Sequence, residues 1–235
     1  MFNGKMKAIT FSYDDGITQD QRLIHLFDKY ALKGTFNLNS GYFGMANSLV
    51  REEVTVAHCK PRAQEIRRIY EGHEIAGHTL THPNPSELMD DEEIIRHVEQ
   101  DRLTLSEIAG YEVVGFAYPG GGINFNEHVA ELIKSNTGVK YARTTVRSHS
   151  FDLPSNLFTC HPTVQHHKEW DNVIQLADEF VNLETETPKC FFIWGHTYEF
   201  DIHDTWDRFE ELLKRLSGHK DIFYGTNKEV LLGTT

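Results

Sequence analysis

The stretch KMKAITFSYDDG, residues 5–16, gives the first indication of the fold, because a strand-like run leads directly into two aspartates and a glycine. Asp and Gly are typical of turns, so this strand is predicted to end at Asp14. Four more polar clusters directly follow strand-like runs: HTLTH at 78–82, PGGG at 119–122, ARTT at 142–145 and WGH at 194–196. In parallel α/β barrels the chemistry lies where strands end, so one shared site is predicted.

The order of the predicted elements indicates a barrel. Strand-like runs alternate with helical patterns about seven times, which is typical of parallel βαβ units that close on themselves. A length of 235 residues suits one such barrel better than two separate cores. We therefore predict an α/β fold, a TIM-like barrel in a single domain over residues 1–235. Residues 40–60 show no regular pattern and are expected to form an irregular surface insertion.

The composition argues against two classes of partner. The formal net charge is -12 at pH 7, and so acidic a surface repels nucleic acid and anionic membranes. No apolar run is long enough to span a bilayer, and the N-terminal residues do not resemble a signal peptide.

The three cysteines form no CxxC pair, and an odd number suits a reducing compartment. A cytoplasmic protein is therefore expected, and its oligomeric state is left open.

Asp14 and Asp15 are adjacent at the end of the first predicted strand. Neighbouring residues of a strand point to opposite sides, so the two carboxylates are expected to have different tasks. One of them is a candidate metal ligand, and the other a candidate partner of a bound water. A simple turn is the alternative, and it is the better interpretation of the DDG cluster taken alone.

His78 and His82 are four residues apart. On a helical turn this spacing puts both imidazoles on one side, within reach of one ion, and Pro83 ends the turn at His82. Two imidazoles and a carboxylate form an open metal site with room for water and substrate, and zinc is the ion we expect first. Two ordinary loop histidines are the alternative for an isolated HxxxH. The DDG cluster after an earlier strand makes the metal interpretation the favoured one.

Further candidates stand at other strand ends. His196 closes an apolar strand, which suits acid–base chemistry at the barrel mouth, and Glu199 is a candidate partner of that imidazole or of substrate. The backbone amide of Gly120 is a candidate donor to a developing oxyanion. Arg143 follows another predicted strand. For each of these residues, an ordinary surface or turn position is the alternative.

Over nearly its whole length the sequence resembles the NodB-homology polysaccharide deacetylases, which form carbohydrate esterase family 4. The segments that carry the resemblance to four motifs of that family are TFSYDDG at 10–16, GHEIAGHTLTH at 72–82, FAYPGGG at 116–122 and FFIWGH at 191–196. The resemblance implies a distorted (β/α)7 barrel and an activity that depends on one divalent metal ion. It also implies roles for individual residues: Asp14 as catalytic base, His196 as general acid, and Asp15, His78 and His82 as metal ligands.

The sequence departs from the family pattern in two motifs. Aligned on Pro119, the arginine of the third motif is replaced by Ala117 and its tyrosine by Gly120. The fourth motif has only a faint counterpart, FDLP at 151–154.

In the family, the third-motif arginine holds the catalytic base in place. Our hypothesis is that Arg143 replaces it and grips Asp14 through two parallel hydrogen bonds, because strand ends converge on one mouth. Arg147 is a weaker candidate. Orientation of Asp14 by backbone amides and water alone is the alternative.

The implied function is removal of acetyl groups from N-acetylated or O-acetylated sugars by attack of a metal-activated water. Hydrolysis of a small non-sugar amide, such as a cyclic imide or ureide, is the first alternative, and it suits a cytoplasmic location. A sugar-binding module without activity is a second alternative, and the complete set of site residues argues against it. A glycosidase is a third, but it leaves His78 and His82 without a role.

Overall fold

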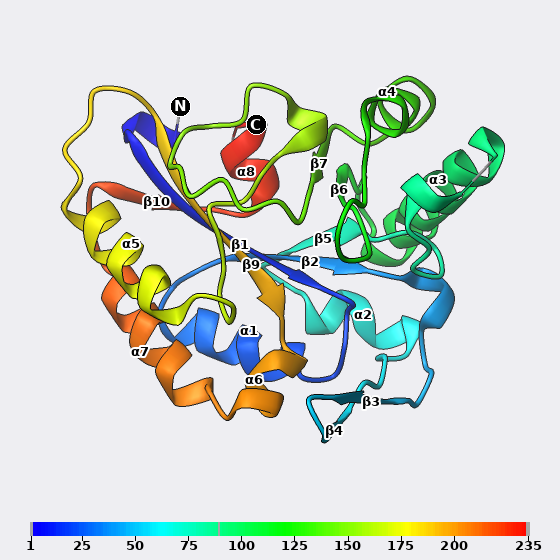
Figure 1. Cartoon of the computed structure of the whole chain (residues 1–235), viewed down its shortest axis with the longest axis horizontal. Coiled ribbons are helices and arrows are strands. Elements are labelled where there is room, and N and C mark those ends of the chain that lie inside the picture. The colour runs from blue at the N-terminus through cyan, green and yellow to red at the C-terminus, as the bar shows by residue number, and fades with distance from the viewer. Residues whose placement is uncertain (1, 89, 234–235) are drawn as a thin grey trace.

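A curled parallel sheet forms the centre of the molecule in the computed structural model, which describes residues 2–88 and 90–233. Seven strands follow one another in the order β7-β6-β5-β2-β1-β9-β8, and an eighth, β10, pairs with the first half of β1 (Figure 1). Their bounds are β1 Lys7–Asp14, β2 Gly34–Leu38, β5 Glu74–Gly77, β6 Gly115–Ala117, β7 Tyr141–Arg143, β8 Val164–Gln165, β9 Lys189–His196 and β10 Ile222–Tyr224.

The chain around Cys160 joins the two ends of this sheet. Cys160 forms a parallel bridge with Arg143 of β7, and its amide donates to the Ala142 carbonyl at 2.9 Å. A few residues later, Val164 and Gln165 pair with β9. The sheet therefore curls into a distorted barrel, and the predicted (β/α)7 fold in a single domain is confirmed.

Helices cover the outside of the barrel and bury its outer face. The longer ones are α1 Asp20–Lys29, α2 Ala63–Ile69, α3 Asp91–Ala109, α4 Glu127–Asn136, α5 Trp170–Asn182 and α7 Trp206–Leu216. Short helices are α6 Tyr198–His203, α8 Asn227–Leu231, η1 Phe2–Gly4, η2 Ser40–Tyr42, η3 Pro85–Glu87 and η4 Leu157–Thr159. Because helices cover one face and the barrel interior the other, all eight residues of β1 are buried.

Residues 40–60 differ from the sequence prediction, because they are not irregular throughout. They contain an antiparallel hairpin of β3 (Ser48–Arg51) and β4 (Val54–Ala57), which lies beside α6 (Figure 1). Its turn uses Glu52 and Glu53 at φ 49° and 66°, a conformation normally signalled by Asn or Gly. The absence of these residues explains why the hairpin was not predicted.

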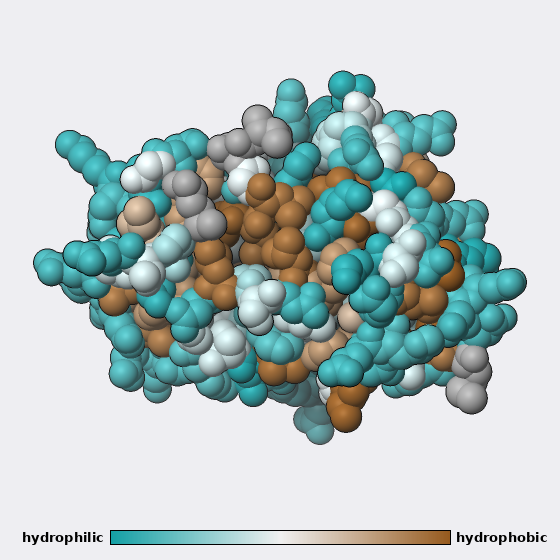
Figure 2. Space-filling model, turned by 90° about the horizontal axis from the view of Figure 1, so that it is seen from above, coloured by the Kyte–Doolittle hydropathy of each residue, from teal (hydrophilic) through white to brown (hydrophobic). Residues whose placement is uncertain are grey.

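The face that carries both chain ends is apolar at its centre (Figure 2). A separate cluster of buried residues includes Phe2, Ala8, Cys190 and Val230. Within the described residues, none of the helices has the length and apolar character needed to cross a bilayer.

Candidate active site and metal centre

Three neighbouring strands bring the first site residues together at one end of the barrel. Asp14, the last residue of β1, is in register with Asn37 of β2 on one side and with His196 of β9 on the other. Strands in register present equivalent positions to the same face. Asp14 Oδ2 therefore lies 4.0 Å from His196 Nε2, and Asp14 Oδ1 accepts a hydrogen bond from Asn37 Nδ2 at 2.7 Å.

The structure places Arg143 beside Asp14. A single nitrogen, Arg143 Nη2, donates to both carboxylate oxygens, which differs from the two parallel bonds expected from the sequence. Arg143 is fully buried, and its guanidinium carbon lies 4.6 Å from the centre of the Trp194 ring. Burial alone would raise the pKa of Asp14, but Arg143, with help from His78 and His196, lowers it below its usual range. Asp14 is therefore an ionised carboxylate at neutral pH. Arg147, the weaker candidate, pairs with Glu169 at 3.0 Å instead.

Asp15, His78 and His82 meet next to Asp14. Each of the three offers one ligand atom, and these atoms all lie within 4.8 Å of one another. Asp15 Oδ1 is 3.4 Å from His82 Nε2 and 3.9 Å from His78 Nε2. Asp15 has a φ of 78°, which breaks the alternation of the strand, so both aspartates face the same side rather than opposite sides.

The chemistry of these donors fits a metal ion. His78 Nδ1 lies 2.8 Å from the Ala117 carbonyl oxygen, and a carbonyl can only accept, so Nδ1 carries the hydrogen and the Nε2 lone pair faces Asp15. Burial is the main cause that lowers the pKa of His78 to about 4, and burial also lowers the pKa of His82. Neutral imidazoles beside an ionised carboxylate are the protonation states that a divalent ion requires.

The segment 78–82 is a non-helical turn, so the predicted helical turn is wrong. Thr79 and His82 have positive φ values of 61° and 60°. Asn39 Nδ2 donates to the carbonyls of His78 and Thr79, at 2.5 and 2.9 Å. The buried carboxylate of Asp101 accepts from the His78 amide at 3.0 Å. These bonds bring the two imidazoles to a centroid distance of 4.9 Å without a helix.

His196 lies between an aromatic ring and a buried carboxylate. Its ring stacks on Tyr198 at 4.9 Å, and its Nδ1 lies 3.3 Å from Glu199 Oε1. Burial would lower the pKa of His196, but Glu199 and the two aspartates raise it to about 9. Glu199 is 5% exposed, and its own pKa falls to about 2 because the neighbouring histidines outweigh burial. His196 is therefore a cation at neutral pH.

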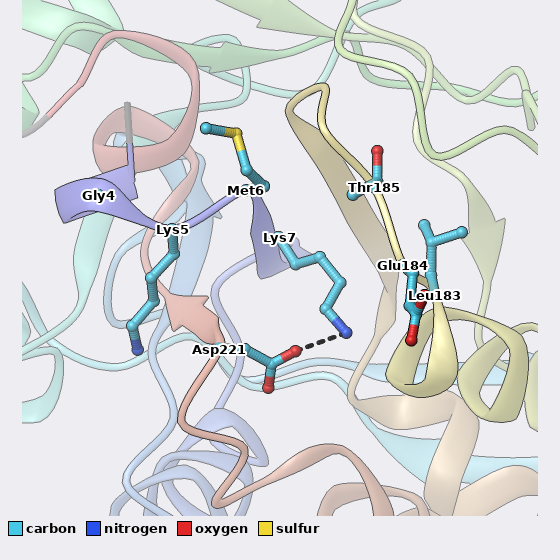
Figure 3. Close-up of a pocket in the computed structure, with 8 residues that line it drawn as sticks. All are labelled: Gly4, Lys5, Met6, Lys7, Leu183, Glu184, Thr185 and Asp221. Carbon is cyan, nitrogen blue, oxygen red and sulfur yellow. Dashed lines mark ion pairs between the residues drawn. The ribbon is translucent and has the colours of Figure 1, made fainter.

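These residues line a cavity of about 1270 Å³, and Gly120 lies on its wall. A smaller cavity of about 450 Å³ lies at the start of β1 (Figure 3). Lys5, Lys7 and Asp221 are among the residues that line it. In that cavity Lys7 pairs with Asp221 at 2.8 Å, and Lys5 donates to the Ile222 carbonyl. Both lysines of this cavity thus have partners, and the candidate catalytic residues line the larger cavity.

Sequence reasoning missed four residues of the site. Asn37 and Trp194 carried a weak signal in the sequence. Asn37 is a polar residue in a largely apolar strand, and Trp194 is an amphipathic residue two positions before His196. His58 and Lys60 carried none, because they come from the segment judged irregular. In the structure both contact Asp15.

The comparisons with known proteins show the family of the chain. Residues 3–142, more than half of the chain, match the family Polysaccharide deacetylase, and the chain therefore belongs to this family. No curated protein matches the sequence.

Solved structures share the fold at low sequence identity. The peptidoglycan deacetylase PdaC from Bacillus subtilis aligns with a TM-score of 0.55 at 18% identity, over 98% of this chain and 91% of that chain. A family 4 carbohydrate esterase from Streptomyces lividans, in complex with acetate, gives 0.55 at 14% identity, over 94% and 92%. A family 4 pseudoenzyme from Bacillus anthracis gives 0.53 at 17% identity, over 97% and 66%. Two other deacetylase structures, from Streptococcus pyogenes and Bacillus cereus, align with 64% of this chain, and the chain spans 61% and 44% of their length.

Proposed function

We propose that this protein is a metal-dependent deacetylase that hydrolyses the acetyl group of an N-acetylated or O-acetylated sugar. The observation that carries the proposal is the meeting of Asp15, His78 and His82 beside an ionised Asp14 and a protonated His196 in one cavity. Family membership supports the same reaction class.

Asp15, His78 and His82 would hold one divalent ion, and zinc suits a site of two imidazoles and a carboxylate. When bound, the ion supplies Lewis acidity, which polarises the acetyl carbonyl and lowers the pKa of water. The alignment of His78 by the Ala117 carbonyl supports this assignment, since metal-binding histidines usually donate their second ring nitrogen to such an acceptor.

Asp14 is the proposed base. It accepts the proton of the attacking water, and it is available for this because Arg143 keeps it ionised. Asn37 and Arg143 together hold the carboxylate in one orientation. Correct orientation is worth several powers of ten in rate, so these contacts support a role beyond charge.

His196 is the proposed acid. Its Nδ1 faces Glu199, so Nε2 remains for donation to the leaving amine or alcohol. The amide of Gly120, on the cavity wall, is a proposed donor to the tetrahedral oxyanion. A cation at Asp15 would reduce the contribution of that carboxylate to the high pKa of His196, but it leaves the contribution of Glu199.

The cavity favours a sugar oligomer over a small amide. Pockets for small molecules usually have volumes of about 300–1,000 Å³, and this cavity is larger and partly aromatic, with Tyr42, Tyr118 and Tyr198 on its wall. A sugar-binding module without activity remains the alternative from another class, since one structural neighbour is described as a pseudoenzyme. The set of Asp14, Asp15 and three histidines is complete in this chain, which supports activity.

Acetate release tests the proposal. Metal-free protein and protein reloaded with zinc would be incubated with N-acetyl sugars, acetylated oligomers and small cyclic amides. We expect release from at least one acetylated sugar, only after reloading. Hydrolysis of a cyclic amide alone would support the small-amide alternative, and stoichiometric metal without any hydrolysis would support the binding module.

A further inference from the structure

The backbone is strained at Asp15, the proposed carboxylate ligand of the metal ion. Asp15 has φ 78°, in the left-handed region that L residues other than Gly rarely adopt. Asp tolerates this region better than most residues, but the conformation still costs free energy unless neighbouring groups hold it. The contacts of Asp15 outside the predicted ligand set therefore matter.

His58 holds one of the two carboxylate oxygens. Its Nε2 lies 3.2 Å from Asp15 Oδ2, whereas Asp15 Oδ1 is the oxygen that faces His78 and His82. The two oxygens thus have separate partners. His58 also packs edge-on against Tyr198 at a centroid distance of 5.6 Å, which restricts its ring.

The same chain segment holds the backbone of this turn. The buried ammonium of Lys60 donates to the carbonyl oxygen of Asp15, and Thr18 donates its amide to the Cys59 carbonyl at 2.9 Å. The amides of His58 and Lys60 bond back to Asn47 and Met45 within the segment, each at 2.8 Å. The side chains of His58 and Lys60 therefore project from a segment whose own backbone is held by hydrogen bonds.

The hairpin β3–β4 attaches this segment to the barrel. Val56 of β4 packs with Ile17 and Tyr198 in a small apolar cluster of its own. Gln19 Nε2 donates to the Ala57 carbonyl at 2.6 Å. Residues 43–60 are thus a wall of the active site rather than a loose insertion.

We propose that His58 is a positioning residue for the metal centre. It donates from Nε2 to Asp15 Oδ2 and so presents Oδ1 to an ion shared with His78 and His82. The inference rests on the proposed function, because it assumes that these three residues bind an ion. Partners of this kind typically contribute about 10–100-fold to metal affinity.

Competition with a chromogenic chelator, starting from metal-free protein, measures the zinc affinity directly. His58→Phe keeps a ring of similar shape but removes the donor, and it should weaken zinc binding by about 10–100-fold. His58→Gln restores an N–H donor and should recover most of the affinity. His149→Phe is the matched control, since His149 lines the same cavity but contacts Glu169, and it should bind zinc as wild type does. Thermal unfolding of each metal-free variant checks that it is folded.

The outcomes distinguish failure of the positioning role of His58 from failure of the proposed metal-dependent function. Wild-type affinity in a folded His58→Phe protein would overturn the positioning role and leave the proposed function intact. No recovery in His58→Gln, together with loss of a histidine from the coordination of a cobalt-loaded protein, would make His58 a ligand and also overturn the role. If wild-type protein binds no zinc, the metal-dependent function itself fails.

Discussion

Arg143 and Ala117 stand opposite each other in register at the ends of β7 and β6. In our hypothesis Arg143 takes over the role of the third-motif arginine of the resemblance, and it lies one strand, about 4.8 Å, from the position of Ala117. The long side chain covers this displacement and reaches Asp14. Convergence of strand ends made Arg143 a predictable candidate. Its stacking on Trp194 was not predictable, because it depends on how the sheet curls.

Arg143→Lys should lower turnover by about 10²-fold while it changes zinc affinity little. The shorter ammonium keeps the charge, but it cannot place one nitrogen against both oxygens of Asp14 while stacking on Trp194. Steady-state kinetics and chelator competition on the same sample measure the two effects. Parallel losses of turnover and zinc affinity would contradict a role that acts through Asp14.

Asp14→Asn should lower turnover by about 10²–10⁴-fold with zinc still bound, because an amide cannot accept the proton of the water. The change also leaves the buried Arg143 without its carboxylate, so a loss of stability is expected. Thermal unfolding must therefore show that the variant is folded at the assay temperature. Turnover near the wild-type value would reject Asp14 as the base.

Glu199→Gln should move the alkaline limb of the pH–rate profile to lower pH. Glu199 is the largest of the groups that raise the pKa of His196 to about 9, so its neutralisation lowers that pKa, and the imidazolium loses its proton at lower pH. Gln keeps the shape and an acceptor for the His196 amide. A profile of kcat against pH measures the shift, and an unchanged alkaline limb would show that Glu199 does not act through His196.

At the scale of the element, the turn at 78–82 shows how the convergence of His78 and His82 was predicted from wrong local geometry. The i, i+4 spacing suggested a helix, but Thr79 and His82 adopt positive φ, and bonds from Asn39 and Asp101 fix the turn. These partners come from other elements, so no local pattern in the sequence could reveal them. The hairpin at 48–57 was missed for a related reason, since its Glu-Glu turn lacks the usual turn residues.

β9 offers an element-scale prediction at Gly195, next to the proposed acid. A Cβ there would lie 2.1 Å from His166 Nδ1, and His166 is buried and stacked on Phe200 at 4.3 Å. Gly195→Ala should therefore destabilise the protein by about 1–3 kcal/mol and lower its Tm. Gly121→Ala is the control, because, apart from its chain neighbours, no atom of the described residues lies within 4 Å of the Cβ it adds. Equal Tm values for both variants would contradict the packing around β9.

At the scale of the whole molecule, alternating patterns and polar strand ends were enough to predict the barrel and the end at which the site lies. The closure of the barrel was not predictable, because the segment from Cys160 to Gln165 joins β7 to β9 through short pairings that leave no periodic signal. Glu199 illustrates the same limit. An ordinary surface position was the alternative for this residue, yet the fold buries it against three histidines.

The central claim is that one ion held by Asp15, His78 and His82 is required for deacetylation. The most direct measurement is a titration of metal-free protein with zinc, in which acetate release from an acetylated sugar oligomer is followed at each addition. The account predicts that activity is absent at the start, rises linearly and reaches a plateau at one zinc per chain. Full activity before zinc is added, or a rise that His78→Ala leaves unchanged, would contradict it.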